Sequence, residues 1–248
     1  MQYYWTLGSV LRTSRVGEKD KRLVLFSREL GRITALVRGA AAPDTHWATS
    51  FEPFSLLYLR LYERSSYFVV TGAEERVVYA RILSSLSRSL KGMAVNQLVE
   101  CFAGPSVQEP SLFAHHVSAL SHLNLASTTE HEDLVFLQFC LTLLSELGFG
   151  LSGLNCVTCG SPIDGPAYFS VTDNGFHCER CCDASERGPL SPELVCFLRN
   201  PEGPLDHRRT LAGIALVTRL LTEVAGRLGV GPSFEKLARN TTTLFRFS

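Results

Sequence analysis

The sequence predicts an α+β protein in two parts. A five-stranded barrel is expected over residues 1–77, and an all-helical domain carrying a four-cysteine insertion at 154–184 is expected over residues 78–248. Three observations support this. Apolar residues recur with a period of two near the start, and after residue 74 the period becomes about 3.6. Two Cys-x-x-Cys pairs then interrupt the helical pattern.

Strand-like runs fill the first part and are separated by short polar or glycine-containing breaks. They cover residues 4–15, 22–27, 32–38, 54–62 and 67–71. In the third run Ile33, Ala35 and Val37 share one face, while Arg32 and Arg38 flank the run on the other. Five short strands in about seventy residues fit a small closed barrel. The OB-fold, which binds single-stranded nucleic acid in many proteins, is the expected form.

Helical signals dominate the rest of the chain. A periodic run extends from Val78 to Phe102 and ends at Gly104 and Pro105, and a second helix is expected over 112–123. A third helix opens at Thr129, has Glu132 at capping-box spacing and ends at Gly148. Ser191 is an expected N-cap before Pro192, and a last helix is expected over 211–228, ended by Gly229. The apolar window 134–151 contains Gln138 and Glu146, so a buried helix is expected there and not a membrane span. The first fifteen residues lack the pattern of a secretory signal, which predicts a cytoplasmic protein.

Charge is distributed unevenly along a chain whose net charge is zero. Residues 92–179 contain nine acidic residues and no Lys or Arg. Residues 1–91 contain fourteen basic and eight acidic residues. This asymmetry predicts a polyanion-binding first part and an acidic middle that repels polyanions or meets a basic partner.

The cysteine spacing predicts a metal site. Cys156 and Cys159 form one pair and Cys178 and Cys181 the other, in a C-x2-C-x18-C-x2-C pattern expected of a four-thiolate zinc site. Such a site has no open coordination position, so the zinc would be structural. A redox pair or reduced thiols are the alternatives, and Cys182 is an alternative to Cys181 as the fourth ligand. Gly160 and Gly175 are expected at the bends of the two loops.

Catalytic signatures do not emerge from the sequence. His177, Cys178 and Glu179 form the H-x-E of zinc deaminases, but in that family H-x-E precedes the Cys-x-x-Cys pair, and here one pair comes first. Phosphate-loop, dinucleotide-binding, H-E-x-x-H and G-x-S-x-G motifs are missing from the sequence. We therefore expect a protein that is not an enzyme, with no catalytic residue.

Basic residues accumulate in the barrel part between residues 12 and 38. The expected phosphate contacts are Lys19, Lys21, Arg22, Arg32 and Arg38. The nearby aromatic side chains that could stack on bases are Tyr3, Tyr4, Trp5 and Phe26. The alternative is a solvated charged face above aromatic residues that belong to the core.

The barrel, the helical domain and the four-cysteine segment, in this order, resemble the recombination mediator family RecO over nearly the whole chain. The resemblance is carried by Val10-Leu11, Gly17-Glu18-Lys19-Asp20, the run from Leu23 to Arg32, Val37-Arg38-Gly39-Ala40, Phe51-Glu52-Pro53-Phe54, the two cysteine pairs and Leu228-Gly229. One departure is that residues 41–47 contain no Lys or Arg where the family usually has basic residues. Trp47 offers a ring for base stacking in that loop.

The resemblance implies a DNA repair and recombination function. It implies an OB-fold, a helical domain and a structural zinc site. It also implies binding to single- and double-stranded DNA, strand annealing, and association with the nucleoid. The implied partners are RecR and the single-strand binding protein, and indirectly the RecA recombinase. The alternative is a zinc-containing protein-interaction or RNA-binding module.

Overall fold

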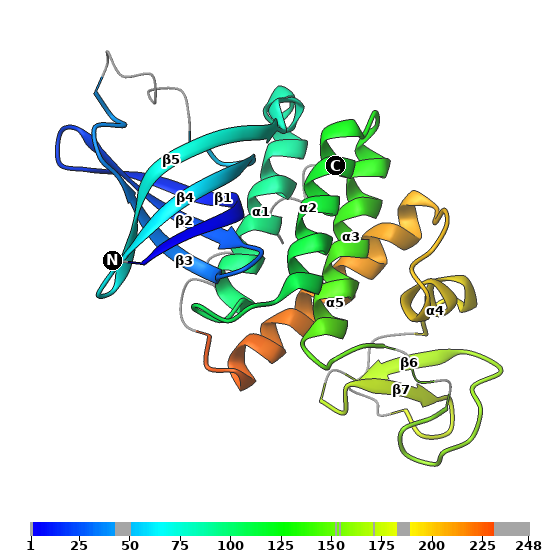
Figure 1. Ribbon diagram of the computed structural model, residues 1–248. Coiled ribbons are helices and arrows are strands. Elements are labelled where there is room, and N and C mark those ends of the chain that lie inside the picture. The colour runs from blue at the N-terminus through cyan, green and yellow to red at the C-terminus, as the bar shows by residue number, and fades with distance from the viewer. Residues whose placement is uncertain are drawn as a thin grey trace. The chain divides into compact units, whose positions relative to one another are not determined.

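The computed structural model describes residues 2–42, 51–151, 153, 155–170, 172–182 and 189–230. The chain divides into two compact units, residues 1–126 and residues 127–248. The first unit contains the barrel and two helices, and the second contains three helices and a short hairpin (Figure 1).

Five strands close the barrel of the first unit in the order β1-β2-β3-β5-β4. Neighbouring strands are antiparallel except β3 and β5, which pair in parallel. The strands are β1 (Tyr3–Val16), β2 (Asp20–Ser27), β3 (Gly31–Val37), β4 (Ser55–Arg64) and β5 (Tyr67–Val78). The five expected strands and the OB-type barrel are thus confirmed.

The last strand is longer than the sequence pattern predicts. We expected the helical period to begin after Glu74, but β5 continues to Val78, with Glu75 opposite Leu57 and Val78 opposite Ser55 of β4. Each paired residue satisfies backbone donors and acceptors, and this outweighs a weak apolar period of 3.6. A single 3-10 turn, η1 (Ala80–Ser84), then leads into the first α-helix.

Alternate residues of the strands fill the barrel interior. In β3, Ile33, Ala35 and Val37 are buried, whereas Thr34 is exposed, as the period of two predicts. The interior cluster consists of Val10, Leu23, Leu25, Ile33, Ala35, Val37, Ala40, Phe51, Leu57, Leu59, Leu61 and Val70. A barrel of this size has no room for more than its own side chains, so ligands must bind on its outer surface or rim.

Helices α1 (Leu86–Phe102) and α2 (Pro110–Leu125) pack against β1 and β2 through a few buried polar contacts. The register between β1 and β2 shifts after Val10, and the buried Asn96 amide of α1 donates to the carbonyl oxygens of Val10 and Leu11, at 3.4 and 3.1 Å. Asn96 thus supplies hydrogen bonds that regular strand pairing leaves unmade at this shift.

His116 of α2 makes a second buried polar contact. Its Nε2 lies 3.0 Å from Ser9 Oγ, and its ring meets Phe26 edge-on with the centroids 5.9 Å apart. Burial lowers the pKa of His116 to about 3, so the ring is neutral at physiological pH. His116 is therefore part of the core of the first unit.

Gly31 sits where the turn before β3 meets the loop after α1. Its φ of +68° lies in the left-handed region, and an added Cβ would lie 1.9 Å from the carbonyl oxygen of Val107. The neighbouring Arg32 carbonyl accepts a hydrogen bond from the Ser106 amide at 3.0 Å. Glycine is thus required both for the turn and for this close approach.

The second unit is built on α3, α5 and a small hairpin. Its elements are α3 (Thr129–Glu146), β6 (Ala167–Ser170), β7 (Gly175–Cys178), α4 (Pro192–Arg199) and α5 (His207–Arg227).

The N-cap of α3 is Thr128, which accepts from the His131 amide at 3.2 Å, so the expected capping box at Thr129 was placed one residue too late. Gly148, with φ +82°, follows the end of α3 as predicted. Across the described helices, none has the length and apolar character needed to cross a membrane.

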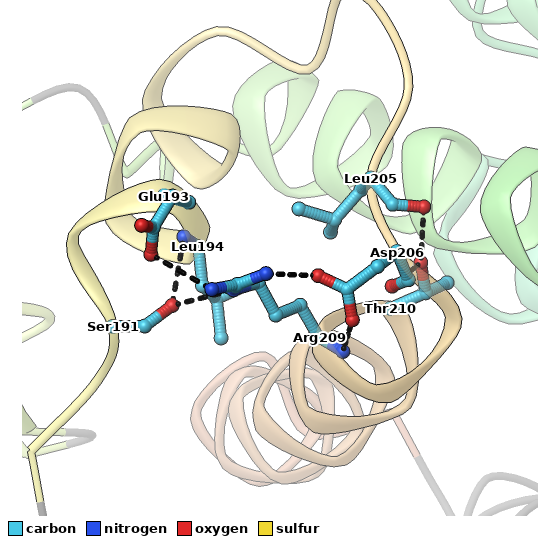
Figure 2. Close-up of polar contacts among 7 residues, drawn as sticks. All are labelled: Ser191, Glu193, Leu194, Leu205, Asp206, Arg209 and Thr210. Atoms are coloured by element: carbon cyan, nitrogen blue, oxygen red, sulfur yellow. Dashed lines mark hydrogen bonds and ion pairs between the residues drawn. The ribbon is translucent and has the colours of Figure 1, made fainter.

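One arginine joins the starts of α4 and α5. The N-cap side chains Ser191 and Asp206 accept from the amides of Leu194 and Arg209. The Arg209 guanidinium also donates to Ser191 Oγ at 3.2 Å, lies 3.2 Å from the Glu193 carboxylate and pairs with Asp206 (Figure 2). The hydrogen bonds from Arg209 lower the pKa of Asp206. The expected N-cap at Ser191 is confirmed.

We expect Gly31→Ala to destabilise the chain more than Gly17→Ala. Both glycines have positive φ, +68° and +61°, but no described heavy atom lies within 4 Å of a Cβ added at Gly17. Gly17→Ala should therefore lower the free energy of unfolding only by the left-handed backbone penalty of about 1–2 kcal/mol. Gly31→Ala should lower it by that penalty and, in addition, by the cost of the clash with Val107. Urea unfolding of the two variants measures the difference, and equal losses would contradict the close approach.

Candidate metal centre and nucleic-acid interface

Four thiols from two loops converge in the second unit. The Sγ atoms of Cys156, Cys159, Cys178 and Cys181 all lie within 4.8 Å of one another, and those of Cys159 and Cys178 are 3.8 Å apart. Among the described residues this is the only group of three or more possible metal ligands that comes together. The cluster could hold a metal ion, and its members are the four cysteines predicted from their spacing.

The first loop is a tight turn. The Gly160 amide donates to the Cys156 carbonyl at 2.8 Å, and Gly160 has a φ of +71°. The Cys156 amide in turn donates to the Ser161 carbonyl at 2.8 Å. These bonds hold the two thiols of the pair on one side of the loop, and the expected bend at Gly160 is confirmed.

The second loop follows β7. The amides of Cys181 and Cys182 both donate to the Cys178 carbonyl, at 2.9 and 3.0 Å. Cys181 is a member of the thiol cluster, whereas the Cys182 thiol contacts the Glu179 carbonyl oxygen at 3.1 Å. The alternative that Cys182 replaces Cys181 therefore finds no support in the geometry.

Gly175 has a different role from the one expected. It lies within β7 and not at a bend, and an added Cβ would come within 2.2 Å of Val157 Cγ1. The Val157 amide donates to the Phe176 carbonyl at 3.0 Å. Gly175 thus allows the first cysteine loop to approach β7 closely, which brings the two pairs of thiols together.

The thiols differ in their readiness to lose a proton. Burial alone would raise the pKa of Cys156, but backbone hydrogen bonds from Cys178, Cys159 and Thr158 outweigh it and bring this pKa to about 6. Hydrogen bonds that the Cys181 thiol donates to the sulfur atoms of Cys159 and Cys178, followed by burial, raise the pKa of Cys181 to about 12. Four crowded thiolates repel one another and need a cation to coexist.

His177 is not part of the thiol cluster. It belongs to β7 of the hairpin, its Nε2 lies 3.2 Å from the Asp173 carboxylate, and its side chain is nearly buried. A deaminase-like site would use this histidine as a metal ligand and leave a position open for water. The group of four sulfur atoms matches a closed coordination shell instead.

The predicted basic residues of the barrel fall into two sets. Lys19, Arg22 and Arg38 are exposed. Lys21 has a side chain only 8% exposed and its ammonium lies 2.8 Å from Glu52, while Arg32 is half-buried and donates to the Ala103 carbonyl at 3.0 Å. Only the first set is free to face a phosphate backbone, because the second is committed to contacts within the protein.

Strand alternation explains why Lys21 and Arg22 differ. Lys21 pairs with Val37 and so shares its inward side, whereas the next residue, Arg22, pairs with Leu36 and faces outward. The basic-poor loop that begins at Ala41 and Ala42 continues through residues 43–47, including Trp47, and these lie outside the described residues.

The expected stacking aromatics also divide. Tyr3 and Trp5 are 54% and 57% exposed on β1, while Tyr4 packs against the barrel core and Phe26 is fully buried. Tyr58 and Arg60 of β4 lie beside Trp5, and Arg76 of β5 lies over the Tyr58 ring. These three residues were not predicted. The alternation of Tyr58, Arg60 and Tyr62 with buried leucines was the signal that could have identified them.

Part of the acidic middle is internal. Glu132 and Asp133 of α3 are buried, and the Glu100 carboxylate of α1 lies 2.8 Å from the Arg12 guanidinium. The charge of residues 92–179 is therefore less available at the surface than the sequence count suggests.

Comparison with known proteins assigns the family. The model for the N-terminal part of recombination protein O matches residues 1–75, and the model for its C-terminal part matches residues 83–210. The DNA repair protein RecO of Bacillus subtilis is 30% identical over 193 residues, 77% of this chain and 74% of the relative. The protein of that name from Haemophilus influenzae strain 86-028NP is 31% identical, over 69% of this chain and 69% of the relative. That from Streptomyces avermitilis is 30% identical, over 76% of this chain and 78% of the relative. The chain therefore belongs to the RecO family of DNA repair proteins.

Proposed function

We propose that this protein is a non-enzymatic mediator of recombinational repair. It binds single- and double-stranded DNA, anneals complementary strands, and acts with RecR to load RecA onto single strands coated by the single-strand binding protein. The observation that carries the proposal is a closed OB-type barrel with exposed cations at one end, in a chain of the RecO family. The work is done by binding energy, without a reacting centre.

The exposed cations lie near one another around the turn between β1 and β2. Arg22 is two residues beyond Asp20, where β2 begins, and Arg38 follows Val37, the partner of Lys21. The Ala41 amide donates to the Lys19 carbonyl at 2.8 Å, and the Asp20 carboxylate accepts from the Gly39 amide at 2.9 Å. These bonds connect the turn to the chain after β3 and bring Lys19 into the same region as Arg38.

Such a cluster suits a phosphate backbone. Exposed Lys and Arg side chains bind phosphates by charge, independently of base sequence, and release counterions on binding. Because duplex and single strand both present phosphates, this surface supports binding to either form. The proposed phosphate contacts are therefore Lys19, Arg22 and Arg38.

The metal of the cysteine cluster is proposed to be zinc with a structural role. A tetrahedron with zinc–sulfur bonds of about 2.3 Å has edges of about 3.8 Å, and the Cys159 and Cys178 sulfur atoms are 3.8 Å apart. Zinc would supply the charge that lets four thiolates share one site. Cys156, Cys159, Cys178 and Cys181 would hold it and leave no position for substrate.

Replacing Arg22 and Arg38 with Ala should weaken DNA binding without unfolding the barrel, because both side chains are exposed. If each neutralises one phosphate, the slope of log K against log salt on single strands should become shallower by about 1.4, from ~0.7 per contact. Fluorescence anisotropy of a labelled oligonucleotide at several salt concentrations measures this slope.

A matched control removes Arg208 and Arg219, which are exposed in the second unit. Its salt slope should equal that of the unmodified protein. An unchanged slope and affinity in the Arg22→Ala, Arg38→Ala variant would mean that these cations are only solvated, and would favour the protein-interaction alternative. A pull-down with RecR and with the single-strand binding protein tests the proposed partners directly.

Protein prepared without chelator should contain one zinc ion per chain. Cys178→Ser should lose it, because three thiolates and a hydroxyl bind zinc less tightly, whereas Cys182→Ser should keep it, since Cys182 lies outside the cluster. Elemental analysis gives the stoichiometry, and structural zinc contributes about 10–16 kcal/mol of apparent binding free energy in small sites. A metal-free preparation, or equal losses in both variants, would refute the assignment.

A further inference from the structure

A ladder of aromatic and arginine side chains covers the outer face of β1, β4 and β5. We call it the aromatic–arginine ladder, and its members are Tyr3, Trp5, Tyr58, Arg60, Tyr62 and Arg76. The strands are neighbours in the closed barrel (Figure 1). The members are distinct from the cations around the β1–β2 turn.

Two rings of the ladder stack on each other, and a guanidinium group lies over each of them. Trp5 stacks on Tyr58 with the centroids 5.5 Å apart and the planes 22° apart. Arg60 Cζ lies 5.8 Å from the centroid of Trp5, and Arg76 Cζ lies 5.4 Å from that of Tyr58. At one end Tyr3 and Tyr62 form a further ring pair at 5.6 Å.

Strand register produces this order. Tyr3 pairs with Tyr62 and Trp5 with Arg60 across β1 and β4, so their side chains point to the same side. Arg60 is held in place by Thr71 of β5, to which it donates from Nε to Oγ1 at 3.1 Å and to the carbonyl at 3.3 Å. The guanidinium is thus positioned before any ligand arrives.

The exposure of the rings is unusual. Tyr3 and Trp5 are 54% and 57% exposed, and they are the only aromatic residues among the exposed large hydrophobics of the described chain. A large ring left in water forgoes the burial free energy that aromatic side chains normally contribute. A ligand that covers these rings would recover it.

The charge of the ladder is modest. Arg76 Nη1 lies 2.9 Å from the Glu74 carboxylate, which offsets part of its charge. Arg60 makes its described hydrogen bonds with Thr71 alone. A surface with rings and little net positive charge favours a ligand that offers flat π-faces and a few phosphates over one held by phosphates alone.

We propose that the aromatic–arginine ladder binds unpaired bases of single-stranded DNA. Bases stack on the exposed rings of Trp5 and Tyr3, while the guanidinium groups of Arg60 and Arg76 meet the adjoining phosphates. This inference rests on the proposed DNA-binding function and adds a strand preference to it. In a duplex the bases are stacked on one another and their faces are not available, so the ladder distinguishes single strands from duplex.

The sequence offers a direct probe of the ladder. It contains two tryptophans, Trp5 and Trp47, so Trp47→Phe leaves Trp5 as the single indole. Stacking of a base on Trp5 should quench its fluorescence when oligothymidylate, which does not pair with itself, saturates the protein. A duplex of equal length should leave it nearly unchanged.

Substitution tests the contribution to affinity. Trp5→Ala combined with Tyr3→Ala should reduce single-strand affinity by about fivefold to 150-fold for each stack lost, with the salt slope unchanged and duplex affinity retained. Trp5→Phe keeps a ring and should keep most of the affinity. Leu83→Ala, which removes an apolar side chain that is 66% exposed on η1, is the matched control and should have no effect.

The outcomes separate the two proposals. If the unmodified protein binds no DNA, the proposed function fails, and this inference fails with it. If it binds single strands while the fluorescence of Trp5 and the single-strand affinity of the Trp5→Ala, Tyr3→Ala variant stay unchanged, only the ladder's role in stacking is overturned. Loss of RecR capture by that variant, with unchanged single-strand affinity, would also overturn it and assign the ladder to a protein partner.

Discussion

The closed barrel constrains everything else in the first unit, because its interior holds only its own side chains. Alternation along each strand therefore decides whether a residue supports the core or meets a ligand. Lys21 and Arg22 are adjacent in sequence, yet one is buried against Glu52 and the other faces solvent. In the same way Leu57, Leu59 and Leu61 fill the barrel while the residues between them form its outer surface.

Most of the fold was predictable because its signals are local. Five strands were separated by turns, and helix ends were marked by Gly148, Ser191 and Pro192. Four cysteines were set at a spacing that predicted the cluster they form. The end of β5 was not predictable from its own residues, because its last residues are held by pairing with β4. The contact of Arg32 with the Ala103 carbonyl depends on a residue distant in sequence, and no periodicity reveals it.

The cysteine cluster is built into the second unit and is not an appendage of it. Phe176 of β7 is buried against Phe169. The Cζ atom of Arg199 in α4 lies 5.3 Å from the centroid of the Phe176 ring. Arg209 then connects the start of α4 to that of α5. A continuous set of contacts thus runs from the two cysteine loops through α4 to α5. A metal ion without a catalytic role would therefore still stabilise this unit.

The strand order also has a consequence for how the barrel forms during synthesis. β1 pairs with β2, which follows at once, but its other neighbour, β4, begins at Ser55. At about 5–20 residues per second, the ribosome needs several seconds to deliver that partner. Until then the open edge of β1 is a template for pairing with other chains. Nascent chains are therefore most exposed to aggregation before the barrel closes, a step that joins residues about fifty to sixty positions apart.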